Sequence, residues 1–369
     1  MAHISATSTA LFQLISKLPF FYLQNSFIDV RSHNFLYNRR KPDSGKISMN
    51  VYLYDADGTD ETLEFSKDIC QKIGDNQLLW IDISERQRTQ IEQVIVALDL
   101  KNVSTEAILK EKERPKLDKF ENFYRFFIIS VKSGDDRKFE KVPIDFIVGK
   151  NFVITVHNGE VDYFAEFRER EKGETNIGAL DAESFVETLL DLHFVSYFRA
   201  LEKIERRVDK FDETILQKDL KDEDFLKKMV ELRSEVSKLR QWFLPQRDVF
   251  YALSRPDFTQ TVASDSFEDF KMLGEHFESA VVAIENSRDT VLSLFNLYTT
   301  RAAHRMNQTI KTLTFVTIIS GGLSVIAGVL GMNFEVGFFK SPGGFWIAIA
   351  GMGLLAGALA IVAKIRNWI

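Results

Sequence analysis

The apolar residues of this chain are concentrated at its C-terminal end. The segments Leu313–Met332 and Phe345–Ala363 contain no charged side chain. About 20 such residues form a helix long enough to cross the hydrocarbon core of a bilayer, which is roughly 30 Å thick. A helix of this length in a soluble protein normally keeps a polar face. The pattern therefore predicts two transmembrane helices near the C-terminus, joined by a short loop.

Upstream of these spans the apolar residues recur at helical spacing. Three long stretches place them at positions i, i+3 and i+4, which predicts amphipathic helices. They are Ala182–Gln217, Glu223–Leu253 and Phe267–Lys311. Pro245 predicts a break in the second helix, because proline removes a backbone donor. The third contains no proline and leads directly into the first apolar span, so we expect one continuous stalk helix. Residues 254–269 are expected to form a loop.

The N-terminal half has a different pattern, with short runs rich in β-branched and aromatic residues. These runs are bounded by Gly, Asp or Lys, which is typical of strands. The predicted strands are Val51–Tyr54, Leu78–Ile83, Phe126–Val131, Ile144–Val148 and Phe152–Val156. The fold class expected from this pattern is an α+β cytosolic domain, followed by a long stalk helix and two C-terminal transmembrane helices.

Residues 1–48 do not fit this scheme. Leu11–Leu23 is apolar, but Lys17 and Pro19 interrupt it and no small-residue cleavage site follows, which argues against a signal peptide. We expect a disordered leader, or a segment upstream of a start at Met49; a peripheral amphipathic segment is the alternative. The full division expected is a leader (1–48), a cytosolic α/β domain (49–180), a helical segment (181–266), a stalk (267–312), a first span (313–332), an outer loop (333–344), a second span (345–363) and a tail (364–369).

The basic residues near the spans predict their orientation. Arg301, Arg305 and Lys311 precede the first span, and Lys364 and Arg366 follow the second, whereas the loop between them has one lysine and one glutamate. Basic residues flanking spans remain on the cytoplasmic side. Both ends of the membrane part are therefore expected in the cytoplasm and the loop outside.

Overall composition excludes several classes of protein. The net charge is −6 and no basic cluster with interleaved aromatics occurs, so nucleic acid is not an expected partner. Cys70 is the only cysteine, which excludes a disulfide framework. Gly149-Lys150 lacks the upstream glycine of a phosphate-binding loop. With no nucleophile–base pattern either, neither an ATP-driven pump nor an enzyme is expected.

A stripe of small and polar residues runs along one side of the first span. At alternating steps of three and four it contains Asn307, Ile310, Thr314, Thr317, Gly321, Ser324, Gly328 and Gly331. Small residues at this spacing allow close helix packing. Hydroxyls and backbone carbonyls equally suit the lining of a path for a hydrated cation. Both interpretations remain open from spacing alone, and a pore would require several copies of the chain around it.

The segment Gly331-Met332-Asn333, between two apolar helices, resembles the GMN signature of the CorA family of divalent-cation channels. Several upstream segments strengthen the resemblance, so that it covers residues 49–369 approximately. They are Met306–Ile319 (MNQTIKTLTFVTII), Leu244–Phe250 (LPQRDVF), Arg114–Ile128 and Val142–His157.

The resemblance implies a funnel-shaped homopentamer in a lipid bilayer, in the inner membrane if the source is bacterial. It also implies Mg²⁺ as the transported and regulatory ion, with Co²⁺ or Ni²⁺ as further substrates. The mouth of the pore would contain Gly331, Met332, Asn333 and Glu335, and Ile310 and Leu313 would form an inner constriction. Candidate acids for a cytosolic regulatory metal site are Asp269, Glu275 and Glu278.

The sequence also departs from the family pattern. Gly321 and Gly322 stand where the family has a methionine followed by a proline, and the outer loop reads Val336-Gly337-Phe338-Phe339. Such changes resemble divergent members, including the ZntB zinc transporters. A Zn²⁺ transporter, with or without proton coupling, is therefore one alternative. A membrane-anchored scaffold or sensor that conducts nothing is the other.

Overall fold

The computed structural model describes residues 49–55, 60–111, 114–134, 138–170, 181–217, 223–255, 266–332 and 343–365. Expectations for the leader, for Asn333 and Glu335 and for the C-terminal tail after residue 365 lie outside the described residues. The chain forms two compact units, which are described separately. One contains residues up to 210 and 226–291, and the other contains residues 211–225 and 292–369.

The first unit is built on a seven-stranded mixed sheet. Its strand order is β2-β1-β3-β7-β6-β5-β4. Only β3 and β7, at its centre, pair in parallel; all other neighbours are antiparallel. The strands are β1 (Met49–Asp55), β2 (Glu61–Leu63), β3 (Gln77–Ile83), β4 (Lys116–Lys119), β5 (Phe123–Ser133), β6 (Phe139–Gly149) and β7 (Phe152–His157).

Strands β5 and β6 are longer than their sequence pattern predicts. Their ladder runs from Phe123 opposite Gly149 to Ser133 opposite Phe139. The ends of both strands contain charged residues, so their sequence pattern predicts a loop there and not a strand. Pro143 lies within β6, just before the ladder with β7 begins at Ile144. At that position β6 has one paired neighbour only, which is where a sheet tolerates proline.

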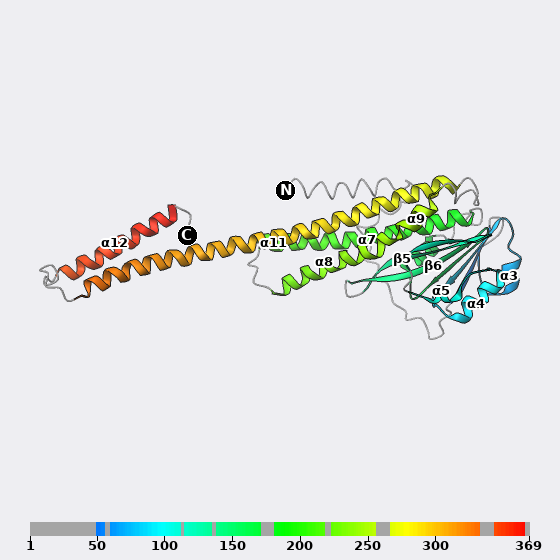
Figure 1. Ribbon diagram of the computed structural model, residues 1–369, viewed down its shortest axis with the longest axis horizontal. Helices are drawn as coiled ribbons and strands as arrows, with labels where there is room; N and C mark the ends of the chain where they lie inside the picture. The colour runs from blue at the N-terminus through cyan, green and yellow to red at the C-terminus, as the bar shows by residue number, and fades with distance from the viewer. Residues whose placement is uncertain are drawn as a thin grey trace. The chain divides into compact units, whose positions relative to one another are not determined.

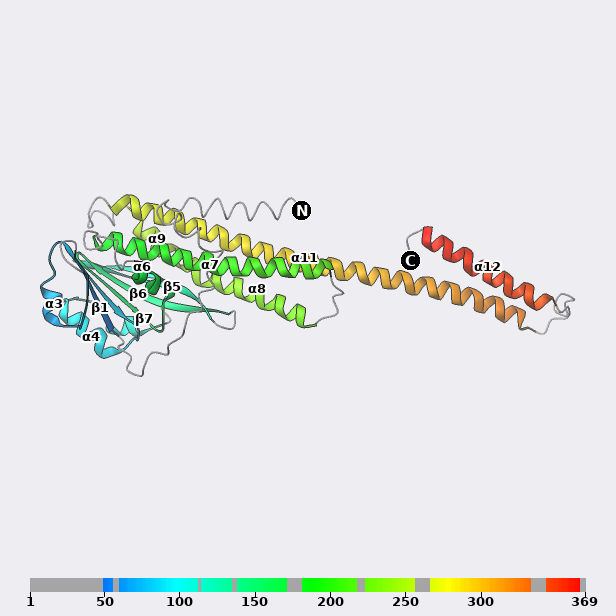
Figure 2. The same cartoon turned by 180° about the vertical axis from the view of Figure 1, so that it is seen from behind.

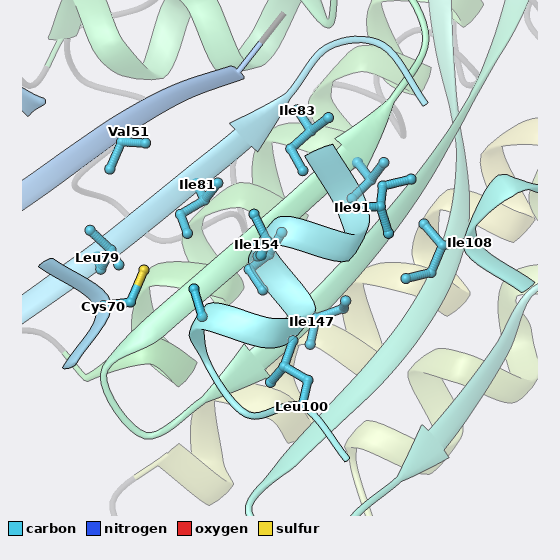
Figure 3. Close-up of a cluster of buried hydrophobic side chains, with 13 residues drawn as sticks. Val51, Cys70, Leu79, Ile81, Ile83, Ile91, Leu100, Ile108, Ile147 and Ile154 are labelled. Atoms are coloured by element: carbon cyan, nitrogen blue, oxygen red, sulfur yellow. The ribbon is translucent and has the colours of Figure 1, made fainter. Parts of the chain in front are cut away.

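One face of the sheet is covered by three short helices, α3 (Lys67–Gln71), α4 (Arg88–Ala97) and α5 (Thr105–Leu109). Figure 3 shows Ile81 and Ile154 of the central strands directed at this layer, where Ile91 and Ile108 meet them. Ser66 and Ser104 cap α3 and α5 by accepting hydrogen bonds from Ile69 N and Ala107 N. Burial of these β-branched side chains holds the layer on the sheet.

The other face of the sheet is aromatic. Trp80 of β3 makes edge contacts with Phe164 of α6 (Asp162–Arg170) and Phe185 of α7 (Ala182–Gln217), both at 5.5 Å between ring centroids. Alternate residues of a strand point to opposite faces, so Trp80 faces the long helices while its neighbours Leu79 and Ile81 face α3 and α4. Figure 1 shows the long helices on the side of the sheet opposite α4 and α5.

The helical layer agrees closely with the sequence pattern. Helix α7 begins after Asp181, whose Oδ1 accepts a hydrogen bond from Ser184 N at 2.7 Å. The predicted break at Pro245 is confirmed: α8 (Glu223–Phe243) is followed by a short 3₁₀ helix, η2 (Leu244–Gln246), and then by α9 (Arg247–Leu253).

The stalk is a single helix, α11 (Ser266–Leu330), of 65 residues. At 1.5 Å per residue it is about 100 Å long. It starts at Ser266, so the loop expected over 254–269 ends earlier than predicted. A second apolar helix, α12 (Gly344–Ile365), follows. Both α12 and the C-terminal part of α11 are long and apolar enough to cross a membrane.

Candidate functional site

The predicted polar stripe lies on the C-terminal part of α11, in the second unit. Each of its eight positions, from Asn307 to Gly331, is exposed within the described part of the chain. Ile310 on the stripe and Leu313 beside it, the residues of the predicted constriction, are 51% and 65% exposed. No segment of the same subunit among the described residues therefore covers this face.

A different face of α11 is partly covered. The residues on it recur at helical spacing and are Phe315, Ile319, Gly322, Leu323, Ile326 and Leu330. On α12 the covered positions likewise form one stripe, consisting of Ala348, Met352, Ala356, Leu359 and Ala363. Figures 1 and 2 show α12 alongside the end of α11 from opposite directions. The two covered stripes therefore face each other, and the polar stripe lies on the side of α11 away from α12.

Two threonine hydroxyls near the membrane part of α11 are partnered within the helix. Thr317 Oγ1 donates to Leu313 O at 2.9 Å, and Thr312 Oγ1 donates to Gln308 O at 3.1 Å. A hydroxyl that donates in this way keeps its acceptor lone pairs free. Thr317 can thus offer oxygen to a hydrated cation without leaving a buried donor unsatisfied. The whole face is neutral, so it can guide an ion that keeps its water shell.

The glycines of the span are not required by their own subunit. A Cβ atom built at Gly321, Gly322 or Gly328 would meet no heavy atom within 4 Å. Glycine also lowers helix stability by about 1 kcal/mol relative to alanine. Contacts among the described residues therefore do not require glycine at these three positions.

Gly331 is different, because it ends the helix. Its backbone N donates to Ala327 O at 2.9 Å, and an added Cβ would lie 3.3 Å from that same oxygen. Met332, the next residue, is 54% exposed. Asn333 and Glu335, the other residues predicted at the mouth, lie outside the described residues.

The three candidate regulatory acids have different surroundings. Glu278 is held by Arg247 of α9 through two hydrogen bonds of 2.9 and 3.0 Å. Glu275 is exposed, and the side chain of Asp269 lies outside the described residues. Among the described residues, no group of three or more His, Cys, Asp or Glu side chains is arranged to hold a metal.

The buried charges of the first unit stabilise the sheet. Asp82 accepts hydrogen bonds from Thr155 at 2.7 Å and lies 3.0 Å from His157 Nε2 and 3.3 Å from Arg168. Burial acts to raise the pKa of the Asp82 carboxyl, but the bonds to His157 and Thr155 outweigh it and the pKa is lowered. Asp82 is therefore a fixed negative charge at the centre of the sheet.

One polar contact was not expected from the sequence. His276 Nδ1 lies 3.0 Å from Asp191 Oδ1 of α7. The two side chains are 16% and 17% exposed. The sequence signal that could have indicated the contact is the pair Glu187 and Asp191, which places two acids one turn apart on an otherwise apolar part of α7.

Comparison with known proteins places this architecture in a family. The cobalt/magnesium transport protein CorA of Thermotoga maritima is 27% identical over 295 residues, which cover 79% of this chain and 83% of that protein. The putative metal ion transporter YfjQ of Bacillus subtilis is 28% identical over 262 residues, covering 69% and 78%.

Among solved structures, the complete CorA magnesium transporter of Methanocaldococcus jannaschii superimposes with a TM-score of 0.71 at 20% identity. The match covers 86% of this chain and 98% of that one. This likeness shows the fold: an α/β domain, a long helix and two C-terminal apolar helices. The family described as CorA-like Mg²⁺ transporter protein matches residues 75–364, and the chain belongs to this family of divalent-cation transporters, which are integral membrane proteins and not enzymes.

Proposed function

We propose that this protein is a passive channel for divalent cations, with Mg²⁺ as its main ion and Co²⁺ and Ni²⁺ as further substrates. The observation that carries the proposal is the position of the polar stripe. It lies within an apolar span, is exposed in the subunit, and faces away from α12. Lipid offers no hydrogen-bond partners to the polar groups of such a face. Copies of α11 are therefore expected to surround a common axis, with this face directed inward.

The ion would enter at the outer end of α11. In this proposal, Gly331 carbonyls and Asn333 amides from five copies form a ring, with Met332 and Glu335 beside it. Mg²⁺ gives up its water reluctantly, so neutral oxygens arranged around its hydration shell can select it. The name of the Thermotoga maritima relative, a cobalt/magnesium transport protein, supports the choice of ions.

The membrane potential alone can drive the entry of a divalent cation, so that ATP hydrolysis is not needed. A divalent ion that falls through an inside-negative potential gains roughly 4–5 kcal/mol per 100 mV. We propose that both ends of the membrane part face the cytoplasm of the cell, where the basic residues Arg301, Lys311 and Lys364 would remain. In a bacterium, the membrane would be the inner one.

The test is ion flux into liposomes that contain the purified full-length protein. Uptake of Mg²⁺, Co²⁺, Ni²⁺ and Zn²⁺ is measured with and without a pH gradient. Asn333→Ala should reduce Mg²⁺ uptake at least tenfold, whereas the same change at the exposed Asn296 of α11 should leave it within about twofold. Absence of any divalent flux from correctly assembled protein would favour a non-conducting scaffold and end the channel proposal.

A zinc transporter is the second candidate. It is favoured by Gly321 and Gly322, which stand at positions where the CorA pattern has larger residues. In the same liposome experiment, Zn²⁺ uptake that exceeds Mg²⁺ uptake and depends on the pH gradient would support it.

A further inference from the structure

Two lysines lie at the end of the membrane part that is nearest the stalk. Lys311 of α11 comes just before the first apolar span, and Lys364 of α12 comes just after the second. Both belong to the second unit, and both are exposed. Figures 1 and 2 show that α12 runs back along α11, so the two lysines share one end of the spans. A charge at the end of an apolar span lies at the level of the lipid headgroups, because the hydrocarbon core excludes it.

The two lysines also lie in the same layer along the helix axes. The covered stripe of α12 ends at Ala363, which is 5% exposed, and the covered stripe of α11 begins at Phe315. The two stripes have the same length and run in opposite directions, which brings Ala363 level with Phe315. Lys364 follows Ala363 directly, and Lys311 lies about one helical turn before Phe315.

Lys311 is on the side of α11 that faces α12, not on the side of the polar stripe. At about 100° per residue, Lys311 and His304 lie within about 40° of Phe315 around the helix axis. Thr317 and Gly321 of the polar stripe lie about 120–160° from Phe315. In the assembly proposed above, in which the stripe faces the axis, the side with Lys311 would lie on the outside, next to lipid.

The two helices supply no negative charge to this layer. Neither the segment Thr290–Phe334 nor helix α12 contains an aspartate or a glutamate, whereas Arg305 adds a further positive charge to α11. Among the described residues, neither Lys311 nor Lys364 forms an ion pair. A counter-charge for the two ammonium groups must therefore come from outside α11 and α12.

The acidic hairpin formed by the ends of α7 and α8 is the other source of negative charge in the second unit. Its described residues meet α11 further from the membrane: Arg301 Nη2 donates to Leu216 O at 2.8 Å, and the ring of Phe225 lies 5.8 Å from that of Tyr298. Lys311 lies about 15 Å beyond Arg301 along the helix. The contacts of the described hairpin residues therefore leave the two lysines to the membrane surface.

We propose that Lys311 and Lys364 form a binding site for the phosphate of an anionic phospholipid in the leaflet nearest the stalk. Each ammonium group has three donors for phosphate oxygens, and the aliphatic stems can lie along the apolar helix ends. A basic residue near the membrane surface strengthens attraction to anionic lipid about fivefold. The bound phosphate joins the free end of α12 to α11. The site requires insertion of the spans into a bilayer, but not conduction of ions.

Spin-labelled lipids test this site on the full-length protein in phosphatidylcholine bilayers. Electron paramagnetic resonance separates lipid held at the protein surface from bulk lipid, so it gives the association constant of labelled phosphatidylglycerol relative to labelled phosphatidylcholine. At low salt the wild type should prefer phosphatidylglycerol at least ~3-fold. In about 1 M salt, where charges are screened beyond roughly 3 Å, the preference should fall below about 1.5-fold.

Three variants locate the preference. Lys311→Gln/Lys364→Gln should reduce it below about 1.5-fold at low salt, whereas Lys311→Arg/Lys364→Arg, which keeps both charges, should retain it. Lys271→Gln is the matched control, because it removes one charge from an exposed position of α11 in the first unit. It should behave as the wild type. If the double glutamine variant does not assemble, each single Lys→Gln variant should still lower the preference clearly.

The wild type alone can overturn the site. Equal association of the two lipids at low salt would mean that another group, such as the acidic hairpin, occupies the lysines. A preference that survives about 1 M salt, or one that persists in Lys311→Gln/Lys364→Gln, would also overturn it. Absence of ion flux would end the channel proposal and leave the lipid measurement unaffected.

Discussion

Oδ2 of Asp145 lies 2.5 Å from Nη1 of Arg86, and both side chains are almost completely buried between the sheet and α5. The other carboxylate oxygen accepts from Nε of Arg125 at 2.8 Å. One buried carboxylate thus forms ion pairs with two guanidinium groups. Arg86 also donates to the carbonyls of Pro143 and Val156, at 3.1 and 3.2 Å, which joins β6 to β7.

Removal of this carboxylate should destabilise the first unit strongly. Asp145→Asn leaves the buried Arg86 without a counter-charge and leaves Arg125 with only the more distant Asp118, and the expected loss is about 3–5 kcal/mol in the free energy of unfolding. Asp118→Asn is the control, because Asp118 also contacts Arg125, at 3.4 Å, but its side chain is 36% exposed. Its loss should be below about 1 kcal/mol. Urea unfolding of the detergent-solubilised protein, followed by tryptophan fluorescence, measures both; equal losses would contradict the assigned role of Asp145.

Gln246 should be intolerant of an apolar replacement. Its fully buried amide donates to Ile129 O at 2.8 Å and to Trp242 O at 3.0 Å, and its Oε1 lies 3.1 Å from His193 Nε2. Gln246→Leu removes the hydrogen bond to the buried His193 Nε2 and one donor each from Ile129 O and Trp242 O, although Ile129 O keeps the Tyr197 hydroxyl at 2.8 Å. These losses should lower the free energy of unfolding by about 2–4 kcal/mol in total. Gln308→Leu, at an exposed position of α11, should change it by less than about 0.5 kcal/mol.

Glu183 should make the stability of the first unit depend on pH. Burial raises the pKa of its carboxyl to about 7, with a further contribution from Asp181. An acid whose pKa is raised on folding stabilises the fold below its unfolded value of about 4.5, and this stability is lost as the pH rises to about 7 and beyond. Glu183→Gln should therefore be more stable than the wild type at pH 8, by roughly 2 kcal/mol, but not at pH 4.5.

The measurement is chemical unfolding at several pH values between these limits. Glu64→Gln, which changes an exposed glutamate before α3, should show the pH dependence of the wild type. A Glu183→Gln protein whose stability follows the wild type at every pH would contradict the assignment.

The two adjacent glycines of the span offer a matched pair. Gly321 lies on the polar stripe, and Gly322 is rotated from it by about 100° around the helix axis. An added Cβ atom meets no heavy atom within 4 Å at either position, although Gly322 belongs to the face of α11 that is directed at α12. Gly321→Leu should reduce divalent-ion flux at least tenfold by narrowing the path, and Gly322→Leu should have a clearly smaller effect. Equal effects at both positions would favour helix packing over a pore.

Much of the helical part could be predicted from the sequence, for a physical reason. A helix satisfies its backbone locally, so its ends are marked by nearby residues such as Asp181 and Pro245. The bounds of α7 coincide with the predicted ones, and the stalk is continuous because no proline interrupts it. Strand pairing is non-local, and no residue near Leu79 specifies Phe152 as its parallel partner. The short edge strands β2 and β4 carry charged residues and gave no strand pattern of their own.

In the candidate site, too, local features could be predicted from the sequence and contacts between separate elements could not. The spacing of Asn307, Thr314 and Gly321 was visible in the sequence, because all lie on one helix. The face of α11 that meets α12 was not visible in the sequence, because it depends on how α12 lies alongside α11. The pairing of His276 with Asp191 was missed for the same reason, since its partner lies on another helix. That the stripe lines a pore stays a prediction.

The central parallel pair of strands also bears on how the protein is made. Strand β3 cannot complete its pairing until β7 has left the ribosome. Strand β7 ends at His157, and the helices α6, α7, α8 and α9 lie between it and the first apolar span in the sequence. Domains generally fold as units during synthesis, in N-to-C order. The sheet can therefore close before any residue of the two apolar spans emerges. Insertion of these spans into the bilayer then acts on a chain whose sheet is already folded.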